Sequence, residues 1–303
     1  MSPIHARTHH QDIRIGTLAG RGERTAAYIG EILSHGFESF QLNFHKRKPE
    51  GMDLKKLARQ VRSIIDEAES SAVISSFGIF GNPLQDKEHV KQLKQAIDAC
   101  ETAGCSIVAS FAGALDGQPV EEAIKPWAKV WRPLVKRAED RGVRLVIENC
   151  PMGGTWHAAN WNIGFCPRAW EMMFNEINSD HLGLEWEPAH QMIQLIDPIS
   201  QLRQWIHKIY HVHGKDASID WNRLRTHGTH AGLPPVISRH PGFGDTNWTD
   251  VISILRQHGY RGFIDIEGWH DPIYAGDLEL TGQVHALNHL KHCRGGDFVE
   301  TVK

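Results

Sequence analysis

The strongest constraint on the fold is an eightfold alternation of short apolar segments with longer amphipathic ones. The short segments have the length and composition of buried β-strands, and they cover residues 13–17, 39–43, 72–76, 106–111, 143–148, 182–187, 209–213 and 262–267. Apolar residues recur at helical spacing in the segments that follow them, residues 24–35, 53–68, 86–104, 119–141, 167–178, 197–208, 248–258 and 277–290. Eight such pairs predict an α/β fold, the single-domain (β/α)₈ TIM barrel.

No break in composition interrupts this alternation, so we expect a tail over residues 1–12 and one barrel over residues 13–303. An open, doubly wound parallel sheet is the alternative. The count of eight and the position of the polar residues favour the barrel. The longest connection, residues 214–246, is rich in Gly, Pro and His, and connections of this length are usually functional or flexible.

Four consecutive predicted strands end in residues that can bind a metal. These residues are Glu148, Glu187, His213 and Glu267. Because the strands of such a barrel all end at the rim that carries the active site, the four side chains are expected to meet there. A buried carboxylate is costly unless it is paired or bound to a metal. The set therefore predicts one divalent cation, Mn²⁺ in the first place, with Mg²⁺, Co²⁺, Fe²⁺ and Zn²⁺ left open.

Such a cation predicts proton-transfer chemistry next to a carbonyl. A metal that binds a hydroxyl and a carbonyl oxygen of a substrate stabilises the enediolate that forms when a base removes the neighbouring proton. The carboxylates of the same site can act as that base.

A second layer of polar residues is expected below the metal. His211 and His213 point to the same face of the strand 209–213, and His211 lies one pleat deeper. Glu185 lies one pleat below Glu187 on the neighbouring strand. We predict a buried hydrogen bond between His211 and Glu185 that orients the metal ligands.

Several of these segments match a known family. They are Ile-Glu-Asn at 147–149, Leu-Gly-Leu-Glu-Trp-Glu-Pro-Ala-His at 182–190, His-Val-His-Gly-Lys-Asp at 211–216, Pro-Gly-Phe-Gly-Asp-Thr-Asn-Trp at 241–248 and Gly-Tyr-Arg-Gly-Phe-Ile-Asp-Ile-Glu at 259–267. In these segments the chain resembles the xylose-isomerase-like TIM-barrel family of sugar isomerases and epimerases, whose superfamily also includes endonuclease IV. The resemblance is specific from Glu148 onward and loose before it.

The resemblance implies roles for individual residues. Glu148, Glu187, His213 and Glu267 would bind one divalent metal, and Glu148 and Glu267 would exchange protons from opposite sides of the substrate. His190 would support a ligand or bind a substrate hydroxyl, and Arg239 would hold a substrate oxygen. Most relatives have aspartate where this chain has Glu187, so the pocket or the metal must accommodate one more methylene.

Other candidate substrate contacts come from the residues themselves. Lys215 precedes Asp216, which indicates either a substrate-binding lysine oriented by the aspartate or a surface ion pair. Trp156, His157 and Asn160, together with Trp161, lie on a long loop over the same rim. They could cover a sugar ring, or the tryptophans could pack in the core.

The leading prediction is a metal-dependent sugar isomerase or epimerase. A lyase or hydratase acting on a 3-keto-sugar or 3-keto-glycoside would use the same metal site and is the main alternative. A phosphodiesterase like endonuclease IV is more remote, because the early strands lack the extra histidines and the net charge of −3 does not suit nucleic acid. A sugar-binding barrel without catalysis is the last alternative.

The remaining composition bears on location and partners. The five cysteines show no CxxC spacing, which is typical of free thiols in a reducing cytoplasm. No secretion signal and no apolar run of about 20 residues occurs, so a cytoplasmic protein without a membrane partner is expected. The expected partner is a small carbohydrate, and the resemblance adds a homo-oligomer.

Overall fold

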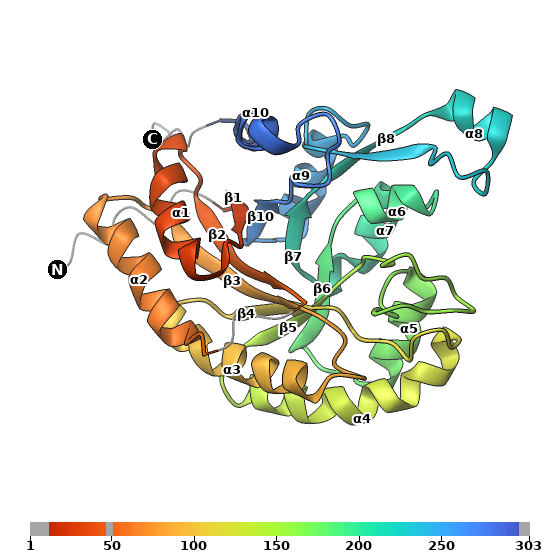
Figure 1. Ribbon diagram of the computed structural model, residues 1–303, viewed down its shortest axis with the longest axis horizontal. Coiled ribbons are helices and arrows are strands. Elements are labelled where there is room, and N and C mark those ends of the chain that lie inside the picture. Colours follow the sequence, from red (N-terminus) through yellow and green to blue (C-terminus); the bar gives the residue numbers. More distant parts are fainter. Residues whose placement is uncertain (1–11, 47–50, 297–303) are drawn as a thin grey trace. The chain divides into compact units, whose positions relative to one another are not determined.

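The computed structural model describes residues 12–46 and 51–296, and its main strands are parallel. They are β1 (Arg14–Ala19), β2 (Ser39–His45), β3 (Val73–Phe80), β4 (Ile107–Ser110), β5 (Arg144–Glu148), β6 (Leu182–Trp186), β7 (Ile209–Gly214) and β10 (Phe263–Ile266). Their order is that of a closed barrel, β1-β10-β7-β6-β5-β4-β3-β2 (Figure 1). The predicted TIM barrel is confirmed, and the open doubly wound sheet is wrong. Nearly all of the predicted tail, residues 1–11, lies outside the described residues.

Eight helices of the described residues lie close to the predicted positions, whereas the short helices α6 and α8 were not predicted. In chain order the described helices are α1 (Thr25–Ile32), α2 (Leu54–Glu67), α3 (Lys87–Ala103), α4 (Val120–Glu139), α5 (Pro167–Glu176), α6 (Ala189–Ile193), α7 (Pro198–Trp205), α8 (Trp221–His227), α9 (Trp248–Gln257) and α10 (Glu279–Arg294). The side chains of Asp53, Asp86, Asp197 and Asn247 accept hydrogen bonds from backbone N–H groups in the first turns of α2, α3, α7 and α9. These caps explain why the four helices start there.

The chain forms two compact units, and the first comprises residues 18–186 and 208–212. Its strands β2 to β6 lie side by side, and helices α2, α3 and α4 pack along them (Figure 1). Large aromatic side chains fill its core, among them Trp127, Trp131, Trp170 and Trp186. The Nε1 atoms of Trp131 and Trp170 donate to the backbone carbonyls of Ala112 and Gly164.

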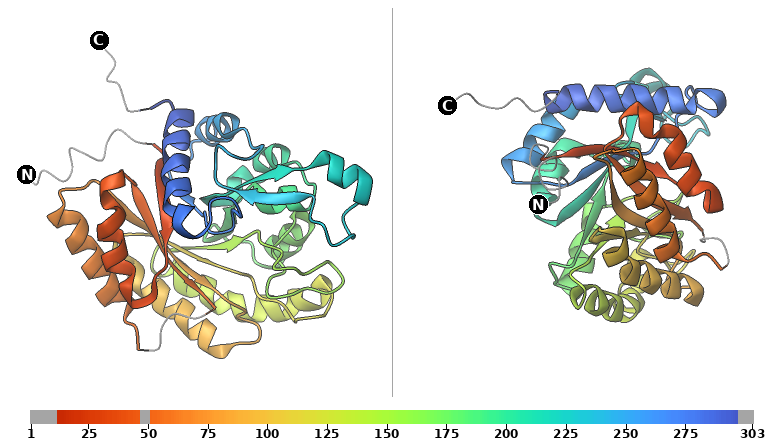
Figure 2. Two further views of the ribbon diagram at one scale, coloured as in Figure 1. Left: turned by 45° about the horizontal axis from the view of Figure 1, so that its top comes forward. Right: turned by 90° about the vertical axis from the view of Figure 1, so that its left-hand side faces the viewer.

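Of the described residues, the second unit comprises 12–17, 187–207 and 213–296. In it α10, shown in dark blue in Figure 2, packs against α9. Arg256 of α9 and Arg294 of α10 form hydrogen bonds with the residues at the start of β1. Arg256 Nε donates to Asp12 Oδ2 over 2.6 Å, and Arg294 Nη1 donates to the carbonyl of Ile13 over 2.8 Å.

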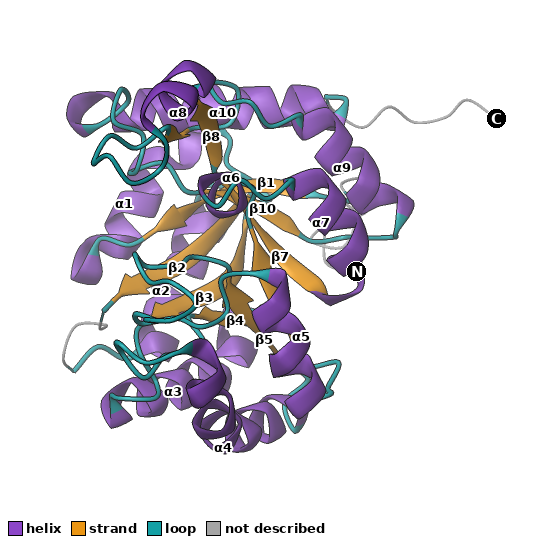
Figure 3. Ribbon diagram, turned by 90° about the vertical axis from the view of Figure 1, so that its right-hand side faces the viewer, coloured by secondary structure: helices purple, strands orange, loops and turns teal. Residues whose placement is uncertain are grey.

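The connection over residues 214–246 contains two strands and a helix, which its Gly-, Pro- and His-rich composition does not predict. Strands β8 (Asp216–Ile219) and β9 (Val236–Arg239) pair antiparallel and carry α8 at their far end (Figure 3). A small apolar cluster of Ala189, Met192, Ala217 and Val236 lies between this hairpin and α6. The hairpin therefore has its own packing within the second unit.

Two predictions from composition can be checked directly. All five cysteines are free thiols, as predicted. Among the described residues, no helix combines the length and apolar character needed to cross a bilayer.

Candidate metal centre

Three potential metal ligands meet in the second unit. Glu187 follows β6, His213 is the fifth residue of β7, and Glu267 follows β10. Their exposed fractions are 0%, 1% and 5%. Each offers one ligand atom, and these atoms all lie within 4.8 Å of one another. Two buried carboxylates beside a buried imidazole suit a divalent cation, because the positive charge offsets the cost of burying the carboxylates.

Two histidines support the carboxylates from the same relative position. His190 Nε2 lies 2.7 Å from Oε1 of Glu187, and His270 Nε2 lies 3.1 Å from Oε1 of Glu267. In both pairs the histidine follows the glutamate by three residues; His190 lies in the first turn of α6 and His270 in the turn after β10. His213 Nδ1 lies 3.2 Å from Oε2 of Glu267. His190 was predicted to be a site residue and His270 was not, although the repeated Glu-x-x-His spacing is visible in the sequence.

Lys215 is buried against the same carboxylates, with 2% of its surface exposed. Its Nζ atom lies 3.0 Å from Glu267 Oε1, 3.8 Å from Glu187 Oε2 and 3.2 Å from His190 Nε2. The alternative of a surface ion pair is therefore wrong.

Asp216 instead accepts hydrogen bonds from Trp248 Nε1, at 2.9 Å, and from the backbone N–H groups of Ala217 and Thr246. Lys215 is thus held by the acidic cluster and Asp216 by the neighbouring loop.

The electrostatics of this cluster follow from the same contacts. Burial alone would raise the pKa of Glu267, but the Lys215 ammonium and hydrogen bonds from His213 and His270 hold that pKa well below its usual value. Burial, followed by the charge of Lys215, keeps the pKa of His190 well below its usual value. Glu267 is therefore a carboxylate and His190 a neutral imidazole at neutral pH.

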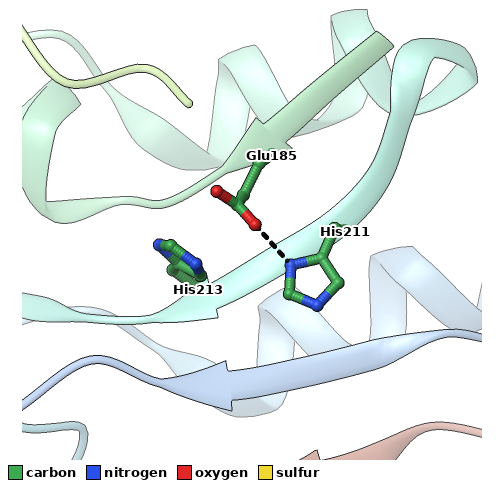
Figure 4. A group of neighbouring side chains, drawn as sticks. All are labelled: Glu185, His211 and His213. Carbon is green, nitrogen blue, oxygen red and sulfur yellow. Dashed lines mark ion pairs between the residues drawn. The ribbon is translucent and has the colours of Figure 1, made fainter. Parts of the chain in front are cut away.

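The predicted contact between His211 and Glu185 is confirmed within the first unit, although as an ion pair rather than as the predicted hydrogen bond. Glu185 Oε1 and His211 Nδ1 lie 2.9 Å apart, and both side chains are fully buried (Figure 4). Gln41 Nε2 also donates to Glu185 Oε1, over 2.6 Å. His213 follows His211 by two residues on β7, so the two imidazoles share one face of that strand.

Glu148 is the last residue of β5 and is buried, as its predicted position requires. It belongs to the first unit, where it pairs in register with Glu185 of β6. Its roles as a metal ligand and as an acid or base stay predictions.

Arg239 and Trp156, two other predicted substrate contacts, form hydrogen bonds with residues outside the metal centre. Arg239 Nε donates to Asp271 Oδ2 over 3.1 Å, and that oxygen also accepts from the backbone N–H of His240. Trp156 is half-buried, and its Nε1 donates to Glu121 Oε1 over 2.6 Å.

Asn160 and His157 are exposed, and Asn160 Nδ2 donates to the carbonyl of Met152. Trp156 and Trp161 are both half-buried, so neither is a core residue. Substrate binding by Arg239, Trp156, His157 and Asn160 stays a prediction.

Comparison with known proteins agrees with this geometry. The family model described as xylose isomerase-like TIM barrel matches residues 29–293. An inosose dehydratase of Clostridium tetani is 32% identical over 99 residues, which cover 32% of this chain and 33% of that protein. The chain thus matches about a third of that relative's length. An inosose dehydratase of Clostridium perfringens is 22% identical over 283 residues, covering 87% and 88%.

Solved structures share the fold at low sequence identity. A xylose isomerase domain protein from Planctomyces limnophilus has a TM-score of 0.68 and 16% identity, covering 95% of this chain and 99% of its own. The 3-keto-D-glucoside 4-epimerase YcjR from E. coli has a TM-score of 0.66 and 17% identity, covering 93% and 100%. The IOLI protein, described with a bound zinc atom, has a TM-score of 0.63 and 18% identity, covering 92% and 96%.

Proposed function

This chain belongs to the xylose isomerase-like TIM-barrel family, and we propose that it is a divalent-metal-dependent sugar isomerase or epimerase. The observation that carries this proposal is the buried group of Glu187, His213 and Glu267, whose ligand atoms lie within 4.8 Å of one another. Buried carboxylates at the carboxyl ends of barrel strands are typical of catalysis rather than of stability.

In this proposal Glu187, His213 and Glu267 hold the cation, and Glu148 completes the set. The preference for oxygen ligands supports Mn²⁺, although a zinc atom is bound in the related IOLI protein. When bound, the cation supplies Lewis-acid stabilisation of negative charge on the carbonyl and hydroxyl oxygens of the sugar.

The residues of this chain move the proton. Glu267 is held in place by three neighbouring side chains, since His213, Lys215 and His270 all have a nitrogen within 3.2 Å of its carboxylate oxygens. It can accept the proton next to the carbonyl, and in an epimerisation Glu148 returns a proton on the other face. Lys215 and His190 lie beside the carboxylates and can donate hydrogen bonds to a substrate oxygen.

A dehydratase acting on a cyclic or 3-keto sugar is the second candidate. Two observations favour it: the matches to proteins named inosose dehydratase, and the buried Lys215 ammonium 3.0 Å from Glu267. Elimination begins with the same proton removal and then needs an acid that protonates the departing hydroxyl. Lys215 is the cationic side chain of the cluster and can supply that proton.

Product analysis separates the two reactions. The Mn²⁺-loaded protein would be incubated in D₂O with D-fructose, D-tagatose and L-ribulose, and separately with an inosose and a 3-keto-glucoside. An isomerase or epimerase gives a new sugar with deuterium at the carbon beside the carbonyl, seen by NMR. A dehydratase gives an unsaturated ketone that absorbs in the ultraviolet. The Glu267→Gln variant is the matched control, and equal turnover by this variant and the wild type would reject the proposal.

A further inference from the structure

A polar pocket lies in the first unit, apart from the residues assigned above to metal binding and proton transfer. Its volume is about 680 Å³, within the range of roughly 300–1,000 Å³ that small-molecule sites occupy. The lining includes His45, Lys46, Asn82, Asp86, Asp116 and Trp161. These residues lie at or beyond the carboxyl ends of β2 to β5, where the active-site loops of a TIM barrel are found.

The walls of this pocket are held together by Asn82, which is 7% exposed. Its Oδ1 accepts from the backbone N–H groups of Leu84 and Ala114, at 3.2 and 3.0 Å. Its Nδ2 donates to the carbonyl of Ala114 and to Oδ1 of Asp116, at 3.0 and 3.1 Å. Asn82 thereby fixes the loop after β3 to the loop after β4, so the pocket is formed before any ligand arrives.

Trp161 completes the wall from the loop between β5 and α5. Its φ angle is +60°, a left-handed conformation that is strained for a bulky residue and is often kept at binding sites. Asp116 Oδ1 accepts the backbone N–H of Trp161 over 2.8 Å and holds it in this conformation. The indole then stacks on the His45 imidazole, with ring centroids 6.2 Å apart and planes inclined by 12°. The strained backbone conformation of Trp161 thus places its indole and the stacked His45 imidazole at the pocket.

The lining chemistry suits a neutral, polyhydroxylated ring. Flat aromatic rings pack against the C–H face of a sugar, and carboxylates and amides accept or donate hydrogen bonds to its hydroxyls. The carboxylates of Asp86 and Asp116 outnumber the ammonium of Lys46, which disfavours an anionic ligand such as a sugar phosphate. The polar walls disfavour an apolar ligand.

We propose that this pocket binds a ring of a neutral sugar, in a disaccharide or another glycoside. Sugar binding at this pocket does not depend on the function proposed above.

Saturation-transfer NMR on the metal-stripped full-length protein tests the pocket separately from catalysis. The probes are cellobiose, trehalose, sucrose, glucose and glucose 6-phosphate. We expect at least one disaccharide to bind more tightly than glucose, with saturation transferred mainly to the C–H protons of one ring. Glucose 6-phosphate should bind no more tightly than glucose.

Two variants locate the binding. Trp161→Ala removes the stacking surface and should weaken disaccharide binding at least about tenfold. His45→Ala should weaken it in the same direction, and His45 is exposed, so this variant keeps its fold even if Trp161→Ala does not. Trp221→Ala, which removes an exposed tryptophan on α8 of the other unit, is the control and should change nothing.

Three results would overturn the proposal: no disaccharide binds, His45→Ala binds like the wild type, or glucose 6-phosphate is the preferred probe. Because the metal is absent from this experiment, such a result leaves the proposed proton transfer standing. Conversely, an inactive enzyme that still binds disaccharides through Trp161 would reject the proposed reaction and keep the pocket.

Discussion

The ammonium of Lys215 lies 3.0 Å from the carboxylate of Glu267, and both side chains are buried. The same ammonium lies 3.2 Å from Nε2 of His190. A buried lysine in contact with a carboxylate and a neutral imidazole is a poor choice for stability alone, since a well-packed apolar pair would serve as well. Its position points to a role in the reaction.

Replacement of Lys215 by methionine should therefore abolish most activity while the metal stays bound. We expect kcat to fall by about 10²–10⁴-fold, the range that a positioned proton donor contributes. Metal content, measured by mass spectrometry, should stay at the wild-type level, because Lys215 is not among the ligands. A variant with wild-type kcat would show that Lys215 is only a structural counter-ion.

The effect of the longer Glu187 side chain can be tested by replacing it with aspartate, the residue expected at this position in relatives. Glu187→Asp withdraws the carboxylate from His190, whose Nε2 now lies 2.7 Å from Oε1. A displacement of about 1 Å at a reacting centre can cost about 10²-fold in rate, so kcat should fall by that order. Steady-state kinetics with saturating Mn²⁺ measure it. Unchanged or faster turnover would indicate that the extra methylene is not used.

The buried pair of Glu185 and His211 should contribute to stability. Replacing His211 by phenylalanine leaves the Glu185 carboxylate buried without its partner imidazole, which should cost about 3–5 kcal/mol of the free energy of unfolding. Urea unfolding measures this loss. The matched control is Arg24→Gln, which breaks the exposed pair with Glu31 and should cost no more than about 1 kcal/mol. Equal effects of the two changes would refute the special role of burial.

Asp271 should make the free energy of unfolding depend on pH in the acidic range. Burial opposes its ionisation, but backbone N–H groups of His240, Ile273 and Tyr274 and the side chain of Arg239 lower its pKa from 3.8 to about 2. A pKa that is lower in the folded state gives stability that is present above about pH 4 and is lost as the pH falls toward 2. The difference corresponds to roughly 2 kcal/mol.

Urea unfolding between pH 5 and pH 2 measures this dependence. The Asp271→Asn variant should be less stable at pH 5 by roughly 2 kcal/mol, because an amide nitrogen would face N–H donors. Its stability should also fall less steeply than that of the wild type toward pH 2. Parallel curves for the two proteins would show that another carboxylate dominates.

The barrel could be predicted because its signals are local. Each strand is a short apolar run, and each helix shows its period and often its cap, as Asp53 does for α2. The positions of Glu187, His213 and Glu267 could be predicted for a related reason: parallel strands of a barrel end at one rim. These positions depend on where the strands end, and the predicted ends of β6, β7 and β10 were correct to within one residue.

Other features depend on contacts that are distant in sequence. The partners of Lys215 are 25 and 52 residues away, so the adjacent Asp216 was the natural but incorrect partner. Strands β8 and β9 have four residues each and gain stability from pairing with each other rather than from an apolar period. Arg239 binds Asp271, a residue 32 positions later that no local pattern marked.

Metal content tests the central claim most directly. The purified protein would be incubated with Mn²⁺, dialysed and analysed by mass spectrometry beside Glu187→Gln and Glu267→Gln, with circular dichroism as the check of folding. We predict one tightly bound divalent cation per wild-type chain and a large loss of metal in both folded variants, since each loses a charged ligand. A wild-type protein that retains no metal, or variants that retain as much as the wild type, would contradict a cation held by Glu187, His213 and Glu267.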